Sequence, residues 1–253
     1  MKLKKKAYGI LAAVLLLVTA VFIGTQGSVK AETLKVSING TELQDGKYYE
    51  FGGSRGSGTM SECDPAALPS VYIYYNAGII EVYNNVMIYS NGASSTEILK
   101  IENGTLTLKG SGRFFLANNR DTDALIAGTA DASIITNEYT GNIELNGYGG
   151  TALIKGLSLV DLKTTGEIAL SSNGATMTGD AFISAGSVKL EASDFAFYLS
   201  DGTVKHMIEA TDAQNGKISL IKTNTLNYLD LINGNSINAS EAFFKAKDVF
   251  VSS

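Results

Sequence analysis

A five-residue word recurs five times from residue 104 onward: glycine, any residue, a β-branched residue or leucine, any residue, leucine. It reads GTLTL (104–108), GNIEL (141–145), GEIAL (166–170), GSVKL (186–190) and GKISL (216–220). The alternation inside each word is that of a β-strand with one buried face. A unit that returns after roughly 20 to 30 residues and holds several short strands is typical of a stacked coil. The repeat therefore predicts a β-solenoid.

Similar words returning once per coil predict that each word lies beside its predecessor in a parallel sheet. We expect the apolar positions, such as Ile168 and Leu170, to point into the coil and the residue between them to face water. We expect the glycine to turn a corner of the coil with a positive φ. An antiparallel meander would instead show tight turns every roughly 8 to 12 residues without a longer period.

The widest gap between words, from position 104 to position 141, has room for two units and holds an unmarked one at 124–137. The chain is therefore expected to form an all-β fold, a right-handed parallel β-helix of about seven coils within residues 70–237. Residues 32–60 predict an N-terminal strand pair and a glycine-rich loop. Residues 238–253 predict a C-terminal cap. It starts with a short helix, because Asn238 and Glu241 fit a capping box, and ends with a final strand at DVFVSS (248–253).

The first residues have the features of an export signal. Four lysines within residues 2–6 precede an almost wholly apolar run at 10–23, and Val29-Lys30-Ala31 offers small residues for cleavage. We predict a signal peptide over residues 1–31, cut between Ala31 and Glu32, and a single β-helix domain over 32–253. The lysine-rich start resembles signals of Gram-positive bacteria. The alternative is a retained anchor, with membrane contact through this segment alone.

Export also changes the charge of the chain. Residues 1–31 contain five of the 20 basic residues and none of the 25 acidic ones, so the mature chain carries a net charge of −10. Such a surface repels phosphates, which makes nucleic acid and anionic membranes poor partners. Cys63 is the single cysteine, so no intramolecular disulfide can form and the packed core must stabilise the fold.

Three segments resemble a known group of proteins. LKVSINGTEL (34–43), IYYNAGIIEVYNNVMI (73–88) and ILKIENGTLTLKGSGRFFL (98–116) are similar to segments of secreted β-helical domains of gut Firmicutes that are labelled carbohydrate-binding. The similarity covers about residues 33–116. It implies a β-helix, a secreted or cell-surface location and a carbohydrate ligand. These motifs are structural rather than catalytic, so they identify no reaction.

Tyrosines concentrate near the start of the mature chain, where seven of the 12 lie within residues 48–89. Period-2 alternation places Tyr72 and Tyr74 on one face of a strand and turns Glu81 and Tyr83 outward from the next. Flat aromatic rings beside carboxylates and amides bind sugar rings by stacking and hydrogen bonds. These four residues are the predicted carbohydrate site. The alternative is that the tyrosines only fill strands, which favour them.

Little else in the chain could carry chemistry. His206 is the only histidine, so a histidine-rich zinc site cannot form, and we predict no Ser-His-Asp triad around it. β-Helical pectin lyases and polygalacturonases cluster aspartates beside a basic residue, and the nearest equivalent here is Arg120, Asp121 and Asp123 in NNRDTD. No aspartate pair resembles the motifs of those enzymes, so we interpret this segment as a polar turn. No catalytic residue, metal site or cofactor is predicted.

The sequence thus predicts a secreted or cell-surface, non-catalytic binding protein that recognises carbohydrate. Two alternatives stay open. The chain could be an adhesin or assembly module that presents a long side to a protein partner. It could also be a polysaccharide lyase or hydrolase that uses Arg120, Asp121 and Asp123.

Overall fold

The computed structural model describes residues 33–52, 59–90, 97–118, 123–172, 177–199, 204–224 and 244–252. All regular secondary structure in these ranges is β-strand, numbered β1 to β21 along the chain. This part of the chain holds no helix long and apolar enough to cross a membrane. The predicted export signal with its cleavage site at Ala31 and Glu32, most of the glycine-rich loop and residues 238–243 lie outside the described residues.

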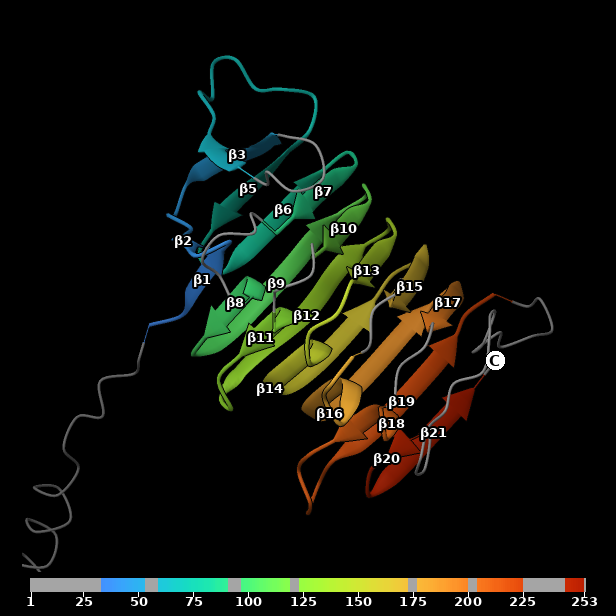
Figure 1. Cartoon of the computed structure of the whole chain (residues 1–253). Coiled ribbons are helices and arrows are strands. Elements are labelled where there is room, and N and C mark those ends of the chain that lie inside the picture. The colour runs from blue at the N-terminus through green and yellow to red at the C-terminus, as the bar shows by residue number, and fades with distance from the viewer. Residues whose placement is uncertain are drawn as a thin grey trace, which may run out of the picture. The chain divides into compact units, whose positions relative to one another are not determined.

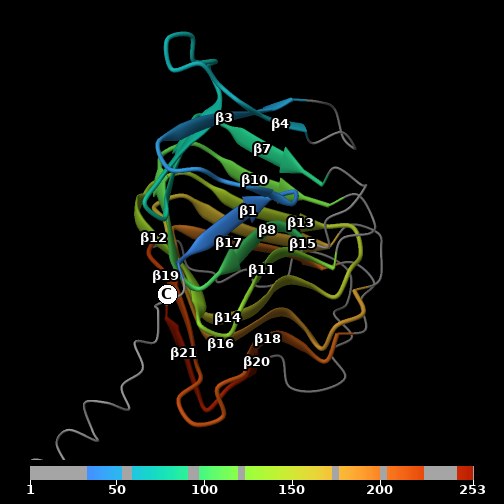
Figure 2. The same cartoon turned by 90° about the vertical axis from the view of Figure 1, so that its left-hand side faces the viewer.

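The chain winds as a coil whose strands form three sides (Figures 1 and 2). Strands on each side of the coil pair in parallel with those of the turns before and after. The first side consists of β8 (Glu97–Glu102), β11 (Ala124–Gly128), the first parts of β14 (Ala152–Lys163) and β16 (Ala181–Ala192), β18 (His206–Ala210) and β20 (Phe244–Lys245).

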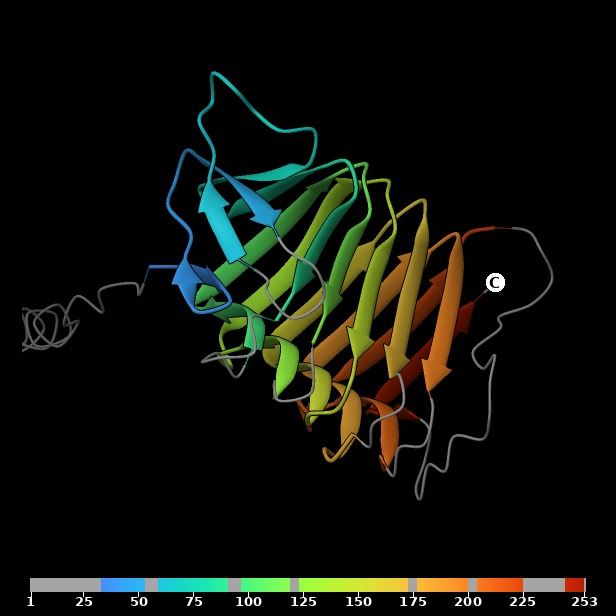
Figure 3. The same ribbon diagram turned by 45° about the horizontal axis from the view of Figure 1, so that its top comes forward.

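The other two sides follow the same rule. The second side consists of β6 (Ile79–Tyr83), β9 (Gly104–Gly110), β12 (Ala132–Tyr139), the second parts of β14 and β16, β19 (Lys217–Lys222) and β21 (Asp248–Ser252). The third side is a separate sheet of β7 (Val86–Tyr89), β10 (Phe114–Ala117), β13 (Ile143–Gly147), β15 (Glu167–Ser172) and β17 (Asp194–Leu199). Figure 3 shows the strands of successive turns side by side, from green to orange.

The predicted parallel stacking of like residues is confirmed for two pairs of words. Ile143 and Leu145 of GNIEL stand beside Ile168 and Leu170 of GEIAL. In the same way, GSVKL (186–190) pairs in register with GKISL (216–220). The apolar positions point inward as expected: Ile168 and Leu170 are at most 1% exposed, and Ala169 between them is partly exposed. Each such buried aliphatic side chain contributes about 1.5–3 kcal/mol to stability.

The prediction that every word stacks on its predecessor is wrong. In the other two cases, GTLTL to GNIEL and GEIAL to GSVKL, consecutive words lie on different sides of the coil. GEIAL lies in the third sheet and GSVKL on the second side, because the interval from position 166 to position 186 is too short for a full turn. GTLTL (104–108) also lies on the second side, where it stacks on residues 132–136. Those residues belong to the unmarked unit that the sequence placed in the widest gap.

The number of turns is smaller than the predicted seven. The third sheet has five strands among the described residues, one for each turn, so the coil makes about five turns. Phe114, Ile143, Ile168 and Phe195 occupy equivalent positions in successive turns of this sheet. Their spacing shows that a three-sided turn needs roughly 25 to 30 residues, which is within the usual range for a solenoid repeat. The strand β5 (Tyr72–Asn76), which the prediction counted within the coils, pairs antiparallel instead.

Most glycines of the words are needed because the backbones of successive turns pack closely, and not because the chain takes a positive φ there. Gly104 has a φ of 80°, as expected, but Gly141, Gly166, Gly186 and Gly216 are not in the left-handed region. A Cβ on Gly141 would overlap the carbonyl oxygen of Gly112 in the turn below, and one on Gly166 would lie 2.7 Å from the carbonyl oxygen of Gly141. Glycine is required there because successive backbones approach too closely for a side chain.

Antiparallel strands finish the N-terminal end of the coil. β1 (Lys35–Ile38) pairs with β2 (Thr41–Glu42), which is the predicted N-terminal strand pair, and β1 also runs antiparallel beside β8. On the second side, β5 pairs with β6, β3 (Lys47–Gly52) pairs with β5, and β4 (Thr59–Glu62) pairs with β3. These strands cover edges that the first turn would otherwise leave unpaired.

The C-terminal end differs in part from its prediction. Residues 244–247 were expected in a helix, yet Phe244–Lys245 is a strand that pairs with β18. The final strand predicted for DVFVSS is confirmed, since Asp248–Ser252 pairs with β19. Pairing with the turn below satisfies their backbone groups and overrides the local helix signal. Among the described residues β21 is an edge strand, and its Val249, Phe250 and Val251 are 47%, 57% and 44% exposed.

Candidate functional site

The predicted tyrosine site lies on the outer face of β3, β5 and β6. Cross-strand register places Tyr48 beside Tyr74, Tyr72 beside Tyr83, and Tyr74 beside Glu81. Alternation turns the intervening Ile73 and Tyr75 into the core, where they are 0% and 4% exposed. The structure therefore brings all four predicted residues together, and it adds Tyr48. We refer to Tyr48, Tyr72, Tyr74 and Tyr83 as the tyrosine ladder.

The rings of the tyrosine ladder contact one another. Tyr72 and Tyr83 are stacked, with ring centroids 4.4 Å apart and planes at 19°. The Tyr48 ring contacts the rings of both Tyr72 and Tyr74. Its centroid is 4.6 Å from that of Tyr74 and 5.7 Å from that of Tyr72, to which it lies edge-on. Aromatic pairs at these separations stabilise one another by about 0.5–1.5 kcal/mol beyond their burial. The contacts hold four rings as one continuous aromatic surface.

Glu81 fixes the exposed end of the tyrosine ladder. Tyr83 is 38% exposed, and its hydroxyl donates a hydrogen bond to Glu81 Oε2 at 2.8 Å. This hydrogen bond, helped by partial burial and the charge of the carboxylate, raises the pKa of Tyr83 to about 12. The phenol therefore stays protonated at neutral pH. In the described part of the chain no hydrogen bond occupies Glu81 Oε1, which is left to accept one from a ligand.

A small pocket of about 210 Å³ adjoins Tyr83. It is lined by Glu81, Val82, Tyr83, Asn84, Lys109, Gly110 and Ser111. Lys109 stands directly across from Glu81 in the register of β6 and β9, yet the two form no ion pair. Among the described residues the Lys109 ammonium has no hydrogen-bonding or ionic partner, so it is available to a ligand.

Sequence reasoning missed Tyr48 and Lys109 as members of this site. Tyr48 belongs to a strand that the sequence assigned to a separate hairpin, and Lys109 follows the first GxΦxL word in the next turn. Their approach depends on which strands pair, and alternation within one strand does not reveal that. The local clustering of tyrosines was the only signal that pointed to this region.

The alternative aspartate cluster is described only in part. Arg120 and Asp121 lie outside the described residues. The Asp123 carboxylate accepts a hydrogen bond from Thr151 Oγ1 and forms an ion pair with Lys155. Burial opposes its ionisation, but the hydrogen bonds from Lys155 and Thr151 outweigh burial and lower the pKa of Asp123. Its oxygens thus join two turns of the coil.

The other titratable groups that the sequence singled out are also part of the scaffold. His206 is 2% exposed and stands beside Ala181 in the register of β16 and β18. Cys63 is buried and free, and its amide donates to the carbonyl oxygen of Tyr48 at 2.8 Å. The described residues contain no group of three His, Cys, Asp or Glu side chains that could hold a metal ion.

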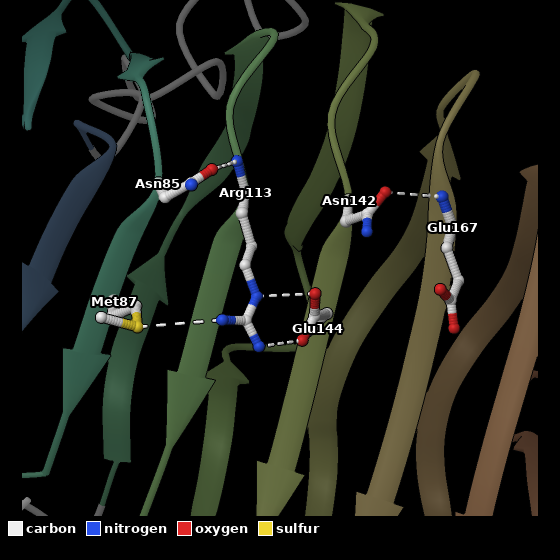
Figure 4. A network of polar contacts seen from close by, with 6 residues as sticks. All are labelled: Asn85, Met87, Arg113, Asn142, Glu144 and Glu167. Carbon is white, nitrogen blue, oxygen red and sulfur yellow. Dashed lines mark hydrogen bonds and ion pairs between the residues drawn. The ribbon is translucent and has the colours of Figure 1, made fainter.

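A second polar surface covers the outer face of the third sheet (Figure 4). Arg113 binds Glu144 through two nitrogens, with Nε 2.6 Å from Oε1 and Nη2 bonded to Oε2. Its guanidinium lies 4.5 Å above the Phe115 ring, and Nη1 is 3.8 Å from Met87 Sδ. We call Met87, Arg113, Phe115 and Glu144 the Arg113 network. These contacts use one N–H group on each guanidinium nitrogen of Arg113, three of its five donors, so fewer donors are left for a ligand.

Glu167 lies on the same outer face, next to the Arg113 network. Its backbone amide donates to Asn142 Oδ1 at 3.1 Å, but its carboxylate has no partner among the residues described. Partial burial, followed by the charges of Glu144 and Asp194, raises the pKa of Glu167. The carboxylate is therefore held at an energetic disadvantage when it is ionised.

Comparison of the chain with protein-family models, curated proteins and solved structures finds no match. The resemblance to carbohydrate-binding β-helical domains thus stays a prediction made from three sequence segments.

Proposed function

We propose that this chain is a secreted or cell-surface, non-catalytic binding protein, built on a right-handed β-helix, that recognises carbohydrate. The ligand lies on the tyrosine ladder, with Tyr72, Tyr74 and Tyr83 in contact with sugar rings and Glu81 accepting hydrogen bonds from their hydroxyl groups. No cofactor takes part.

The exposed stack of Tyr72 and Tyr83 is the observation that supports this proposal most. Rings that only filled the core would be buried, as those of Tyr49 and Tyr75 are. Here the rings are fixed by mutual contact, partly open to solvent, and flanked by an acceptor at Glu81 and a donor at Lys109. Apolar rings beside a few convergent polar groups are the usual composition of a small-molecule binding surface.

A glycan array probed with the mature chain tests the proposal. We expect retention on a restricted set of glycans, and we expect Tyr72→Ala combined with Tyr83→Ala to abolish it. Tyr198→Ala is the matched control, because Tyr198 is 44% exposed on β17, away from the tyrosine ladder. Unchanged retention by the double variant would refute the proposal.

The two alternatives give different results in related assays. A protein partner would retain the chain on host cells, and added sugars would not release it. A lyase or hydrolase would create new reducing ends in uronic-acid polymers. If Asp123 is catalytic, Asp123→Asn would abolish that activity. If Asp123 only joins two turns of the coil, the same substitution would leave the activity unchanged.

A further inference from the structure

A larger pocket lies further along the same corner of the coil, at the carboxyl ends of β12 and β14. Its volume is about 420 Å³. It is lined by Thr136, Asn137, Glu138, Tyr139, Thr140, Lys163, Thr164 and Thr165. We call it the bulge pocket, because an irregularity in β12 shapes it. Its lining residues are mostly threonine, asparagine, glutamate and lysine, but carbon atoms make up most of the surface that they expose to it. It therefore suits a ligand that combines apolar faces with hydrogen-bonding groups, as a sugar ring does.

The irregularity inserts an extra residue into β12. Thr136 stands beside Leu108 and Tyr139 beside Gly110, so Asn137 and Glu138 together oppose the single residue Lys109. Glu138 takes a φ of 56°, a left-handed conformation that is unfavourable for a glutamate. Bulges and residues with such backbone angles concentrate at functional sites, where they re-aim side chains.

Both ends of the bulge are anchored. Thr136 Oγ1 accepts a hydrogen bond from the Lys163 amide at 2.5 Å and donates to the Lys163 carbonyl oxygen at 2.7 Å. Tyr139 is 2% exposed, and its hydroxyl donates to the Gly112 carbonyl oxygen at 2.6 Å. Between these anchors Asn137 and Glu138 are exposed, and their side chains form no hydrogen bond or ion pair within the described ranges.

The bulge pocket continues the surface that begins at the tyrosine ladder. Lys109 lies between Glu81 on one side and the bulge on the other. The Thr140 amide donates to the Gly110 carbonyl oxygen at 2.9 Å, which ties the rim of the bulge pocket to that of the small pocket. The strands β6, β9, β12 and β14 follow one another in Figure 1. At about 4.8 Å per strand, β12 lies about 10 Å from β6 along the stack, which a single sugar ring cannot bridge.

We propose that the bulge pocket is a second subsite for an extended, neutral oligosaccharide whose first rings lie on the tyrosine ladder. This inference rests on the proposed function. Asn137 and Glu138 accept and donate hydrogen bonds with the hydroxyl groups of the distal rings, and Lys109 donates to a ring between the two subsites. The ligand is neutral because Glu81 and Glu138 flank the ammonium of Lys109 and the mature chain has a net charge of −10.

A chain-length series tests the second subsite. Calorimetry would measure the binding of mono-, di-, tetra- and hexasaccharides of glucose, mannose and xylose, with oligogalacturonates as the acidic series. We expect affinity to rise from disaccharide to hexasaccharide by at least about tenfold. Asn137→Ala combined with Glu138→Asn should remove that gain and leave disaccharide binding unchanged. Asparagine tolerates the left-handed conformation at position 138, so the fold should persist. Asp131→Asn removes a carboxylate near the opposite end of β12 and is the matched control.

The outcomes separate this inference from the proposed function. Equal affinity for disaccharide and hexasaccharide, or an unchanged gain in the bulge variant, would overturn the second subsite even where the tyrosine ladder binds sugar. Tighter binding of oligogalacturonates than of every neutral series would overturn the neutral ligand. If no saccharide binds the wild-type chain, both proposals fail.

Discussion

The tyrosine ladder and the Arg113 network are both polar and aromatic surfaces on the outside of one coil, and they differ in what is left unpaired. In the Arg113 network the guanidinium contacts Glu144, Phe115 and Met87 at once, and Phe115 is 8% exposed. The two surfaces are similarly open, since Met87 is 44% and Tyr83 38% exposed. At the tyrosine ladder, by contrast, the neighbouring Lys109 has no partner among the described residues.

This difference separates support of the fold from readiness to bind. A charged group that already makes strong hydrogen bonds within the chain gains less from a ligand, because it must first lose bonds that it has. A fixed aromatic surface beside unpaired donors and acceptors gains contacts without such a loss. Residue composition alone does not distinguish the two surfaces, since each combines aromatic rings with glutamate and a cation.

The largest expected effect tests whether the two surfaces share one scaffold. A side chain at position 141 would overlap the backbone at Gly112, at the corner that leads into the third sheet. Gly141→Val should therefore lower the free energy of unfolding by about 3 kcal/mol or more. Gly52→Ala is the control, because its Cβ would meet only Thr59 Oγ1 at 3.4 Å. Thermal unfolding followed by circular dichroism measures both. If Gly141→Val also abolishes glycan retention, the tyrosine ladder depends on the same cooperative unit.

The next effect concerns the Arg113 network itself. Arg113→Met removes one partner of an ion pair whose side chains are 36% and 20% exposed, so solvent weakens the interaction. We expect a loss of about 1–2 kcal/mol in urea unfolding, since Glu144 is left partly buried without its hydrogen bonds. Glycan retention should not change. If Arg113→Met reduced glycan retention and left the stability unchanged, the Arg113 network would bind ligand as well.

A smaller effect is expected from Glu167. The folded chain holds the pKa of this carboxyl above its unfolded value, so the folded state favours the protonated form. The associated stability is present below the unfolded pKa and is lost as the pH rises through the raised folded pKa. Glu167→Gln should therefore raise the melting temperature at neutral pH and reduce its decline between acidic and neutral pH. An identical decline in the variant would show that Glu167 is not strained.

Period and alternation were enough to predict the β-helix. The inward positions of GEIAL and GSVKL follow from the side-chain period of 2, and like residues of adjacent turns do stack. The number of turns was predicted less well, because the word occurs on two of the three sides of the coil. A short interval, such as that from position 166 to position 186, therefore marks a change of side and not a full turn. The prediction of a C-terminal helix was wrong for a related reason. Pairing with the turn below, which no local signal reports, made Phe244 and Lys245 a strand.

The candidate site was predictable to the extent that it is local. Tyr72, Tyr74, Glu81 and Tyr83 were found because alternation within β5 and β6 fixes which side chains face outward. Lys109 and Glu138 could not be found in this way. Lys109 comes from the next turn, and Glu138 depends on a bulge that becomes visible only in the register between β9 and β12.

The smallest effect concerns Glu81 and sharpens the description of the tyrosine ladder. The hydrogen bond to its carboxylate raises the pKa of Tyr83 to about 12, above an unfolded value of about 10. The stability linked to this shift is present below pH about 10 and is lost as the pH rises toward about 12. Glu81→Leu removes both the acceptor and the charge, so the pKa of Tyr83 should fall toward 10. Absorbance titration of tyrosinate, with Tyr83→Phe subtracted, measures this change. A Tyr83 pKa that stays near 12 in Glu81→Leu would mean that burial, and not the carboxylate, protects the hydroxyl, and Glu81 would then be less firmly held for a ligand.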